Sequence, residues 1–257
     1  AIRIDRIDAG SEAEALGLQP GDELLSVDEN ELNDTLDYDF YTDSSSFHLK
    51  AKVADGIREW DVRRAERGPF GCDFSTYLGD QKHSCSNHCM FCFIDQMPPA
   101  CRKTLYVKDD DWRMSLMMGN FITLTNVDDQ EFDRILRRRA SPLFISVHAT
   151  DPAVRVKMMK NPDAAKLLPR LRQFKEHGIK FHCQIVLCPG INDGAVLEDT
   201  LQTLFTLHPA AQSAAPSLSP RSRKTRSANF AGSVMRYFRV LSASSRAQIL
   251  SSTEGPK

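Results

Sequence analysis

The sequence predicts an α/β protein with three regions: a small, mostly β unit at residues 1–66, a series of strands and helices at 67–210, and a tail at 211–257. Three observations support this prediction. Apolar and polar residues alternate early in the chain, as in half-buried strands. Strand-like and helix-like segments then alternate between residues 121 and 207, which is typical of a parallel sheet or barrel. The apolar periodicity stops after residue 210.

The first unit is predicted from short alternating runs. Three isoleucines at positions 2, 4 and 7 begin it. Residues 47–53 read Phe-His-Leu-Lys-Ala-Lys-Val, the pattern of a half-buried strand. Trp60 and Val62 indicate a further strand after the turn at 55–56, and the Gly- and Pro-containing residues 66–71 indicate a boundary.

Residues 10–28 of this unit carry a local resemblance. A helix-forming stretch leads through Gly17-Leu-Gln-Pro-Gly-Asp22 into the strand-like residues 23–28. This segment resembles bacterial PDZ domains, which bind extended peptides by adding a strand to a sheet edge. The resemblance implies a PDZ-like domain at 1–66 with a peptide partner. The alternative is a unit that only packs on its neighbour.

The second region predicts a βα series. Its expected strands are residues 121–125, 143–147 and 181–187. Its expected helices follow Asn126, which can serve as a cap, and occupy 164–177 and 194–207. Acidic residues begin the first helix and arginines end it, as the helix dipole favours. Strands and helices of these lengths predict a parallel arrangement.

The tail differs in composition from the rest of the chain. Residues 211–257 contain eight Lys/Arg and one Asp/Glu, whereas residues 1–210 contain 25 and 33. The tail is rich in Ser, Arg and Ala, which predicts a disordered basic segment. A second hypothesis is that it is an aberrant product of a reading-frame shift or truncation. Translation of the other frames downstream of codon 210 would test it.

Charge and cysteine content narrow the class of protein. The net charge of −1 gives no sign of a nucleic-acid or membrane partner. No apolar run is long enough to span a bilayer, and the charged, alternating N-terminal residues do not resemble a signal peptide. Seven cysteines are an odd number, and three of them are clustered. We therefore expect a cytoplasmic protein with free thiols and a metal site.

The clustered cysteines are the most informative feature. Cys85, Cys89 and Cys92 have the spacing C-x3-C-x2-C and offer three thiolates on one loop. Thiolates hold iron–sulfur clusters, and three ligands leave one iron of a [4Fe–4S] cube open. A zinc site with His83 or His88 as fourth ligand is an alternative, although no second pair of ligands follows. A redox C-x-x-C pair would leave Cys85 unused.

A family resemblance rests on this loop and its surroundings. Phe91 gives the motif C-x3-C-x-aromatic-C, which resembles the signature of radical S-adenosylmethionine (SAM) enzymes. The wider segments 92–99, 102–111, 119–126 and 146–151 resemble a bacterial branch with an N-terminal PDZ-like domain and an uncharacterised C-terminal domain. The resemblance covers residues 1 to about 209 and does not extend into the tail.

The resemblance implies a partial (β/α) radical SAM barrel with the cluster at the carboxyl ends of its strands. It implies a [4Fe–4S] cluster on the three cysteines and SAM on the open iron. One electron, from a donor such as flavodoxin or ferredoxin, would cleave SAM to methionine and a 5′-deoxyadenosyl radical that attacks an unknown substrate. It assigns no catalytic residue.

Six residues are the expected SAM-binding positions. Gly119 and Asn120 stand where many members of the family carry a Gly-Gly-Glu segment, although no glutamate is present here. Strand alternation predicts that Ser146 and His148, and in the next strand His182 and Gln184, face inward. Asn192 lies in a loop that resembles an adenosine-contacting loop. The expected set is Gly119, Asn120, Ser146, His148, Gln184 and Asn192.

Two other functions stay open from the sequence. One alternative is a PDZ-like adaptor whose cluster serves structure or electron transfer, and the other is a truncated inactive product. The second reading follows because only about four barrel strands fit before residue 210, and a half-built barrel exposes an edge.

Overall fold

The computed structural model describes residues 1–80 and 82–218, and it divides the chain into two compact units, Ala1–Lys82 and the residues from His83 onward. The division lies later than the expected boundary at residues 66–67. Strand β7 (Cys72–Asp73) pairs with β2 (Arg6–Ile7), and Leu78 forms a bridge with Asp34. These contacts hold the residues after 66 in the first unit.

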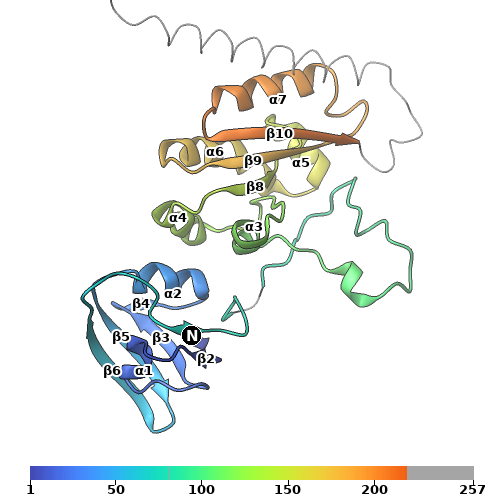
Figure 1. Cartoon of the computed structure of the whole chain (residues 1–257). Coiled ribbons are helices and arrows are strands. Elements are labelled where there is room, and N and C mark those ends of the chain that lie inside the picture. The colour runs from blue at the N-terminus through green and yellow to red at the C-terminus, as the bar shows by residue number, and fades with distance from the viewer. Residues whose placement is uncertain (81, 219–257) are drawn as a thin grey trace, which may run out of the picture. The chain divides into compact units, whose positions relative to one another are not determined.

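The first unit is built on a five-stranded antiparallel sheet (Figure 1). Its order is β1-β3-β5-β6, with β4 paired to β3. Two short helices complete the unit. The bounds are β1 Ile2–Arg3, β3 Glu23–Val27, β4 Asn30–Glu31, β5 Ser46–Val53, β6 Gly56–Arg63, α1 Glu12–Ala15 and α2 Thr35–Thr42.

The alternation expected in residues 47–53 is confirmed. Phe47, Leu49 and Ala51 of β5 are buried in the core of the unit, whereas His48 and Lys50 are half-buried. The expected passage from helix to strand is also present. Ser11 caps α1 through its side chain, and Gly17 and Gly21, both at positive φ, turn the chain toward β3. The similarity to PDZ domains stays a prediction.

The second unit contains a three-stranded parallel sheet in the order β10-β9-β8, as Figure 1 shows. Helices cover one face, where Phe132 of α4, Phe174 of α6 and Phe181 of β9 are in ring contact. The bounds are α3 Trp112–Met118, α4 Asp129–Arg138, β8 Leu143–Ser146, α5 Pro152–Met159, α6 Leu167–Glu176, β9 Phe181–Leu187, α7 Ala195–Thr206 and β10 Ala211–Leu218, with 3₁₀ turns at Lys103–Tyr106 and Pro162–Lys166.

Two expected elements are different in the structure. Residues 121–125 form only one parallel bridge, between Ile122 and Ile145, because Leu124 adopts a positive φ of 62° that a continuing strand does not allow. The next helix is capped by Asp128, which accepts from Glu131 N at 2.8 Å, rather than by Asn126. The strands expected at 143–147 and 181–187 are confirmed to within one residue.

Strand β10 corrects the expectation that the tail begins at residue 211. Residues 211–218 pair in parallel with β9 along its length. Gln212, Ser213, Ala215 and Ser217 are exposed, so the strand needs no apolar periodicity, and its pairing comes from backbone hydrogen bonds. The remainder of the expected tail, residues 219–257, lies outside the described residues.

The sheet of the second unit is open. Within residues 83–218 its three strands do not close into a barrel. Among the described residues, no helix has both the length and the apolar character needed to cross a bilayer.

Candidate functional site

The three clustered cysteines lie on an irregular loop of the second unit. Cys85, Cys89 and Cys92 are all half-buried, free thiols. Cys85 N donates to Lys108 O at 3.0 Å, and Cys92 N donates to Cys89 O at 3.0 Å, which closes a turn between the last two cysteines. The loop therefore has a defined backbone course without belonging to a helix or strand.

Helix α5 anchors this loop at its centre. His88 N donates to Met159 O at 3.1 Å, and Met90 N donates to Met158 O at 3.0 Å. The last carbonyls of a helix have no partner within it, and here the two residues that flank Cys89 supply the donors. The loop is thus tied to the C-terminal end of α5.

Phe91 connects the loop to the ends of two strands. Its ring is 4.5 Å from the ring of His148, which follows β8, and it packs in an apolar cluster with Cys188, which follows β9. Active sites of α/β proteins gather at the carboxyl ends of parallel strands. The cysteine loop lies at this end of the sheet.

Asn87, inside the cysteine motif, is a buried hydrogen-bonding centre that the sequence reasoning missed. Its side chain is 1% exposed. Nδ2 lies 3.2 Å from Cys85 Sγ, 3.0 Å from Thr123 Oγ1 and 2.9 Å from Thr125 Oγ1, while Oδ1 accepts from Asn161 Nδ2 at 2.8 Å. Asn87 therefore joins the loop to two segments distant in sequence. In the sequence, the only sign of this role was the position of an amide side chain between Cys85 and Cys89.

Two buried charged residues, Asp110 and Arg155, lie close to the loop. Asp110 accepts from the backbone N and the hydroxyl of Thr123, both at 2.5 Å. Burial raises the pKa of Asp110 to about 6, although these bonds and the charge of Arg155 lower it. The pKa of Arg155 falls to about 10, mainly through burial, and the charges of Asp110 and Cys89 oppose this effect. Arg155 is therefore a cation at neutral pH.

Arg155 also fixes the backbone around the site. Its guanidinium donates to the carbonyls of four residues from three segments, at 2.7–2.9 Å: Thr123, Ser146, Val147 and Ala164. The residue is 1% exposed. A planar guanidinium with several fixed donors suits this arrangement better than an ammonium would. In the sequence, the only sign that Arg155 is buried was its position between two apolar residues, Val154 and Val156.

The thiols themselves favour a cationic ligand. Burial raises the pKa of Cys89 to about 12, and the neighbouring thiolates of Cys85 and Cys92 raise it further, against the charge of Arg155. Burial also raises the pKa of Cys85, while hydrogen bonds from Asn87 lower it. A bound metal ion offsets this mutual repulsion, because its positive charge stabilises the deprotonated thiolates that coordinate it.

The donor set fits an iron–sulfur cluster. In the described part of the chain, no three His, Cys, Asp or Glu side chains are close enough to share one metal ion. In a cluster, by contrast, each cysteine binds a different iron, so the sulfur atoms need not converge on one point. Three soft thiolates on one anchored loop are ligands suited to such a group.

Two of the expected SAM-binding residues are brought together. Ser146 of β8 and Gln184 of β9 are direct partners in the parallel ladder. They share a face with Phe144 and His182, whose rings stack at 4.9 Å, and His182 bonds Ser213 Oγ of β10 at 2.8 Å. Phe144, His182 and Gln184 are only half-buried, so this face of the sheet is partly open.

His148 and Asn192 are buried and bonded to neighbouring backbone. Val186 N donates to His148 Nδ1 at 3.1 Å, which leaves the proton of the neutral ring on Nε2. Burial, and then the charge of Arg155, lowers the pKa of His148 to about 3. Asn192 bonds Cys188 N, His148 O and Val186 O at 2.7–3.0 Å. Both side chains hold the strand ends in place.

Gly119 and Asn120 lie at the end of α3. Gly119 is its left-handed C-cap, with φ of 74°, and a Cβ there would lie 3.6 Å from the ring of Phe144. Asn120 is exposed and donates to Asp109. Gly119 is therefore close to β8, whereas the hydrogen bond of Asn120 is made to Asp109 and not to Ser146 or Gln184.

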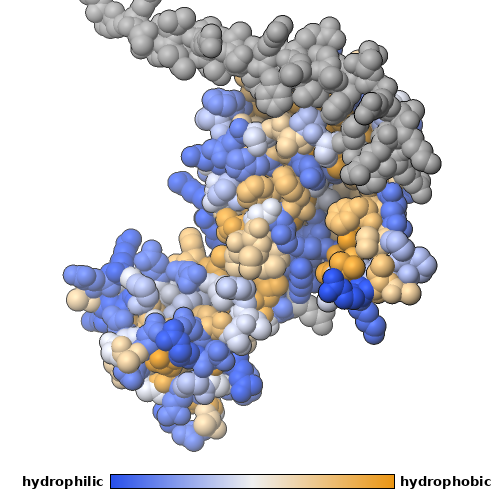
Figure 2. Space-filling view, turned by 45° about the vertical axis from the view of Figure 1, so that its right-hand side comes forward, coloured by the Kyte–Doolittle hydropathy of each residue, from blue (hydrophilic) through white to orange (hydrophobic). Residues whose placement is uncertain are grey.

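Exposed apolar side chains follow the third cysteine. Figure 2 shows apolar surface among the polar side chains of the second unit. The exposed residues of this segment are Phe93, Leu105, Tyr106, Val107, Met118 and Phe121. All of them follow the cysteine loop in sequence, and they leave apolar surface on this part of the second unit.

A loop with three thiols at the carboxyl ends of parallel strands defines this unit as an α/β protein with a candidate iron–sulfur site. Residues 64–214 match the family of radical SAM-like domains. This match covers more than half of the chain, so the chain belongs to that family. A search of curated proteins gave no match. The matched residues include all three clustered cysteines and the first residues of β10.

Proposed function

We propose that this chain is a radical SAM enzyme that holds a [4Fe–4S] cluster on Cys85, Cys89 and Cys92 and binds SAM beside it. The carrying observation is the thiolate loop at the carboxyl ends of β8 and β9, where Phe91 contacts His148. When bound, the cluster supplies the electron that cleaves SAM to methionine and a 5′-deoxyadenosyl radical for an unknown substrate.

The residues of the chain have separate roles in this proposal. The three thiolates hold iron, and α5 holds the loop through His88 and Met90. Ser146 and Gln184 offer polar groups to SAM on the partly open face of the sheet. The surrounding backbone is held by His148, Asn192 and Gly119. Asn120 is an additional candidate for contact with SAM. A partial barrel is the arrangement that we propose for this domain.

The proposal is tested by 5′-deoxyadenosine formation. The chain is reconstituted anaerobically with iron and sulfide, reduced with dithionite and given SAM. We expect 5′-deoxyadenosine from the wild type and none above background from Cys89→Ala, because one iron ligand is missing. Cys101→Ala is the matched control, since Cys101 is also a half-buried free thiol but lies outside the motif. A cluster without SAM cleavage would instead support electron transfer or a structural role.

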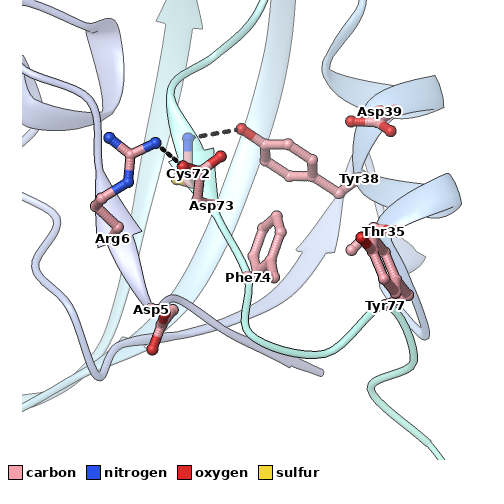
Figure 3. A pocket seen from close by; sticks show the side chains of 9 residues that line it. All are labelled: Asp5, Arg6, Thr35, Tyr38, Asp39, Cys72, Asp73, Phe74 and Tyr77. Carbon is pink, nitrogen blue, oxygen red and sulfur yellow. Dashed lines mark hydrogen bonds and ion pairs between the residues drawn. The ribbon is translucent and has the colours of Figure 1, made fainter.

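A second candidate function is peptide binding by the first unit. A cavity of about 450 Å³ is lined by residues of α2 and β7, Tyr38, Cys72 and Phe74 among others. Figure 3 shows these lining side chains. A neighbouring cavity of about 490 Å³ shares Tyr38, Asp39, Cys72 and Asp73 with it. Tyr38 OH accepts from Cys72 N at 3.0 Å, and Arg6 pairs with Asp73. A groove beside a short strand suits an added peptide strand.

Peptides selected from a displayed random library against the full chain test this function. Thr35→Arg places a long side chain in the lining of the cavity, so we expect it to weaken the selected peptides at least about tenfold. Thr76→Arg is the control, because Thr76 is exposed and does not line either cavity. Equal affinity in both variants would place the peptide elsewhere.

A further inference from the structure

Asn87 has no role in the function proposed so far, yet it is the buried polar residue in closest contact with a metal-binding thiol. Its Nδ2 lies 3.2 Å from Cys85 Sγ. It is 1% exposed, so water does not compete for this position. A donor fixed against a ligand atom acts on the metal through that ligand.

The hydrogen bonds around the Asn87 side chain determine where its two amide protons point. Asp110 takes the hydroxyl proton of Thr123, at 2.5 Å, so Thr123 Oγ1 is free to accept one Asn87 N–H. Asn87 Oδ1 accepts from Asn161 Nδ2, and also from the Thr125 hydroxyl at 3.1 Å. An amide nitrogen carries two protons. Thr125 Oγ1 also lies 2.9 Å from Nδ2 and 2.9 Å from Thr123 Oγ1, so these two hydroxyl oxygens share one N–H and the other N–H is directed at Cys85 Sγ.

We infer that Asn87 is a positioning residue that raises the reduction potential of the cluster by donating an N–H to Cys85 Sγ. The inference rests on the proposed function, because it requires Cys85 to be an iron ligand. Reduction adds one negative charge, and donors to the ligand sulfur stabilise the more negative state. One electron passes from a low-potential reductant such as dithionite or flavodoxin, which is oxidised; no bond is made or broken.

The orientation of Asn87 is held from outside the cysteine loop. Thr123 and Thr125 precede α4, and Asn161 follows α5. Since three side chains fix the amide, its N–H does not rotate away when the charge on sulfur changes. The donor is in place before the electron arrives, which is the condition under which a hydrogen bond shifts an equilibrium most.

The test is a potentiometric titration of the reconstituted chain, followed by the electron paramagnetic resonance signal of the reduced cluster. Asn87→Asp keeps the shape of the side chain and its acceptor oxygen but removes the N–H donor. Asn87→Leu removes the donor without adding charge. At a fixed potential we expect the ratio of reduced to oxidised cluster to fall about tenfold in Asn87→Leu, or about 59 mV for one electron. Asn87→Asp should shift further in the same direction.

Thr125→Val is the matched control. It removes one of the three side chains bonded to Asn87, but Thr123 and Asn161 still hold the amide and keep the N–H near Cys85 in place. We expect its potential to equal that of the wild type, with iron and sulfide per chain measured in every variant. An equal shift in Thr125→Val would overturn the inference, because general loosening of the loop would then be the cause.

The outcomes separate the two proposals. A wild type that forms a cluster, with unshifted potentials in Asn87→Leu and Asn87→Asp, overturns the role of Asn87 and leaves the proposed function intact. If Asn87→Leu does not retain iron, an unshifted potential in Asn87→Asp still overturns the role of Asn87, because the lost donor and the added charge would both lower the potential. A wild type that forms no cluster overturns both.

Discussion

Replacing Arg155 with methionine is expected to lower the free energy of unfolding by about 3–5 kcal/mol. The guanidinium is 1% exposed and donates to four backbone carbonyls. Methionine fills similar space but offers no donor, and each buried acceptor without a partner costs about 1–3 kcal/mol. Denaturant unfolding measures the loss, with the fluorescence of buried Trp112 as a probe within the second unit.

Arg172→Met is the matched control for this prediction. Arg172 also lies in a helix of the second unit, but it is exposed. Exposed substitutions away from special contacts usually change stability by less than about 0.5 kcal/mol. A loss below about 1 kcal/mol in Arg155→Met would contradict the prediction, since it would mean that the four carbonyls find other partners.

Asp111→Asn is expected to cost about 3–5 kcal/mol at neutral pH, because it breaks a fully buried ion pair. The side chains of Asp111 and Arg113 are both 0% exposed, and two guanidinium bonds of 2.9 and 2.8 Å join them. The carboxylate also accepts from the backbone N of Arg113 and of His83, each at 3.0 Å. Asparagine turns one acceptor into a donor that faces these groups.

The pH dependence of this effect has a definite sign. Burial alone would raise the pKa of Asp111, but the bonds from Arg113 and His83 outweigh it and hold the pKa below its ordinary value. A lowered folded pKa stabilises the fold above the unfolded pKa, about 3.9, and the gain is lost as pH falls through the folded pKa. The difference between wild type and Asp111→Asn should therefore shrink below about pH 4.

Asp163→Asn is the control for Asp111. Its ion pair with Lys166 measures 2.7 Å, but both side chains are about half exposed. Exposed pairs contribute about 0–1 kcal/mol. Unfolding of both variants at pH 7 and at pH 3 provides the comparison, and an Asp111→Asn cost that does not change with pH would contradict the stated cause.

The predictable parts of the fold are those in which burial of one face makes apolar residues recur at a regular spacing in the sequence. β9 has a fully buried face at Phe181, Cys183 and Ile185, and its bounds were predicted from this alternation. β10 has no such face, because its side chains are largely exposed and its pairing is made by backbone groups. Composition alone therefore assigned its residues to a tail.

Local backbone conformation explains another difference. The β-rich residues 121–125 have strand propensity, but Leu124 is left-handed and the ladder stops after Ile122. The bend directs Thr123 and Thr125 toward Asn87. Propensity was overridden here by tertiary hydrogen bonds, which a pattern of residue types does not contain.

The sequence was sufficient to propose the three cysteines as metal ligands, but it did not indicate the residues that support their loop. The cysteine spacing and Phe91 are local in sequence, and the family match includes them. Asn87, Asp110 and Arg155 act through partners up to 74 residues away, such as Asn161 for Asn87. Only folding brings such partners together. His148 and Asn192 bond to backbone groups at the ends of β8 and β9, and their place beside SAM stays a prediction.

The two bonds from the cysteine loop to α5 have a consequence for local opening. The amide hydrogens of His88 and Met90 can exchange with solvent only when they separate from Met159 and Met158. The loop lacks secondary structure of its own, yet its protection from exchange follows that of the helix end. Loop and helix therefore open as one cooperative segment, and the three cysteines become mobile on the timescale of that opening.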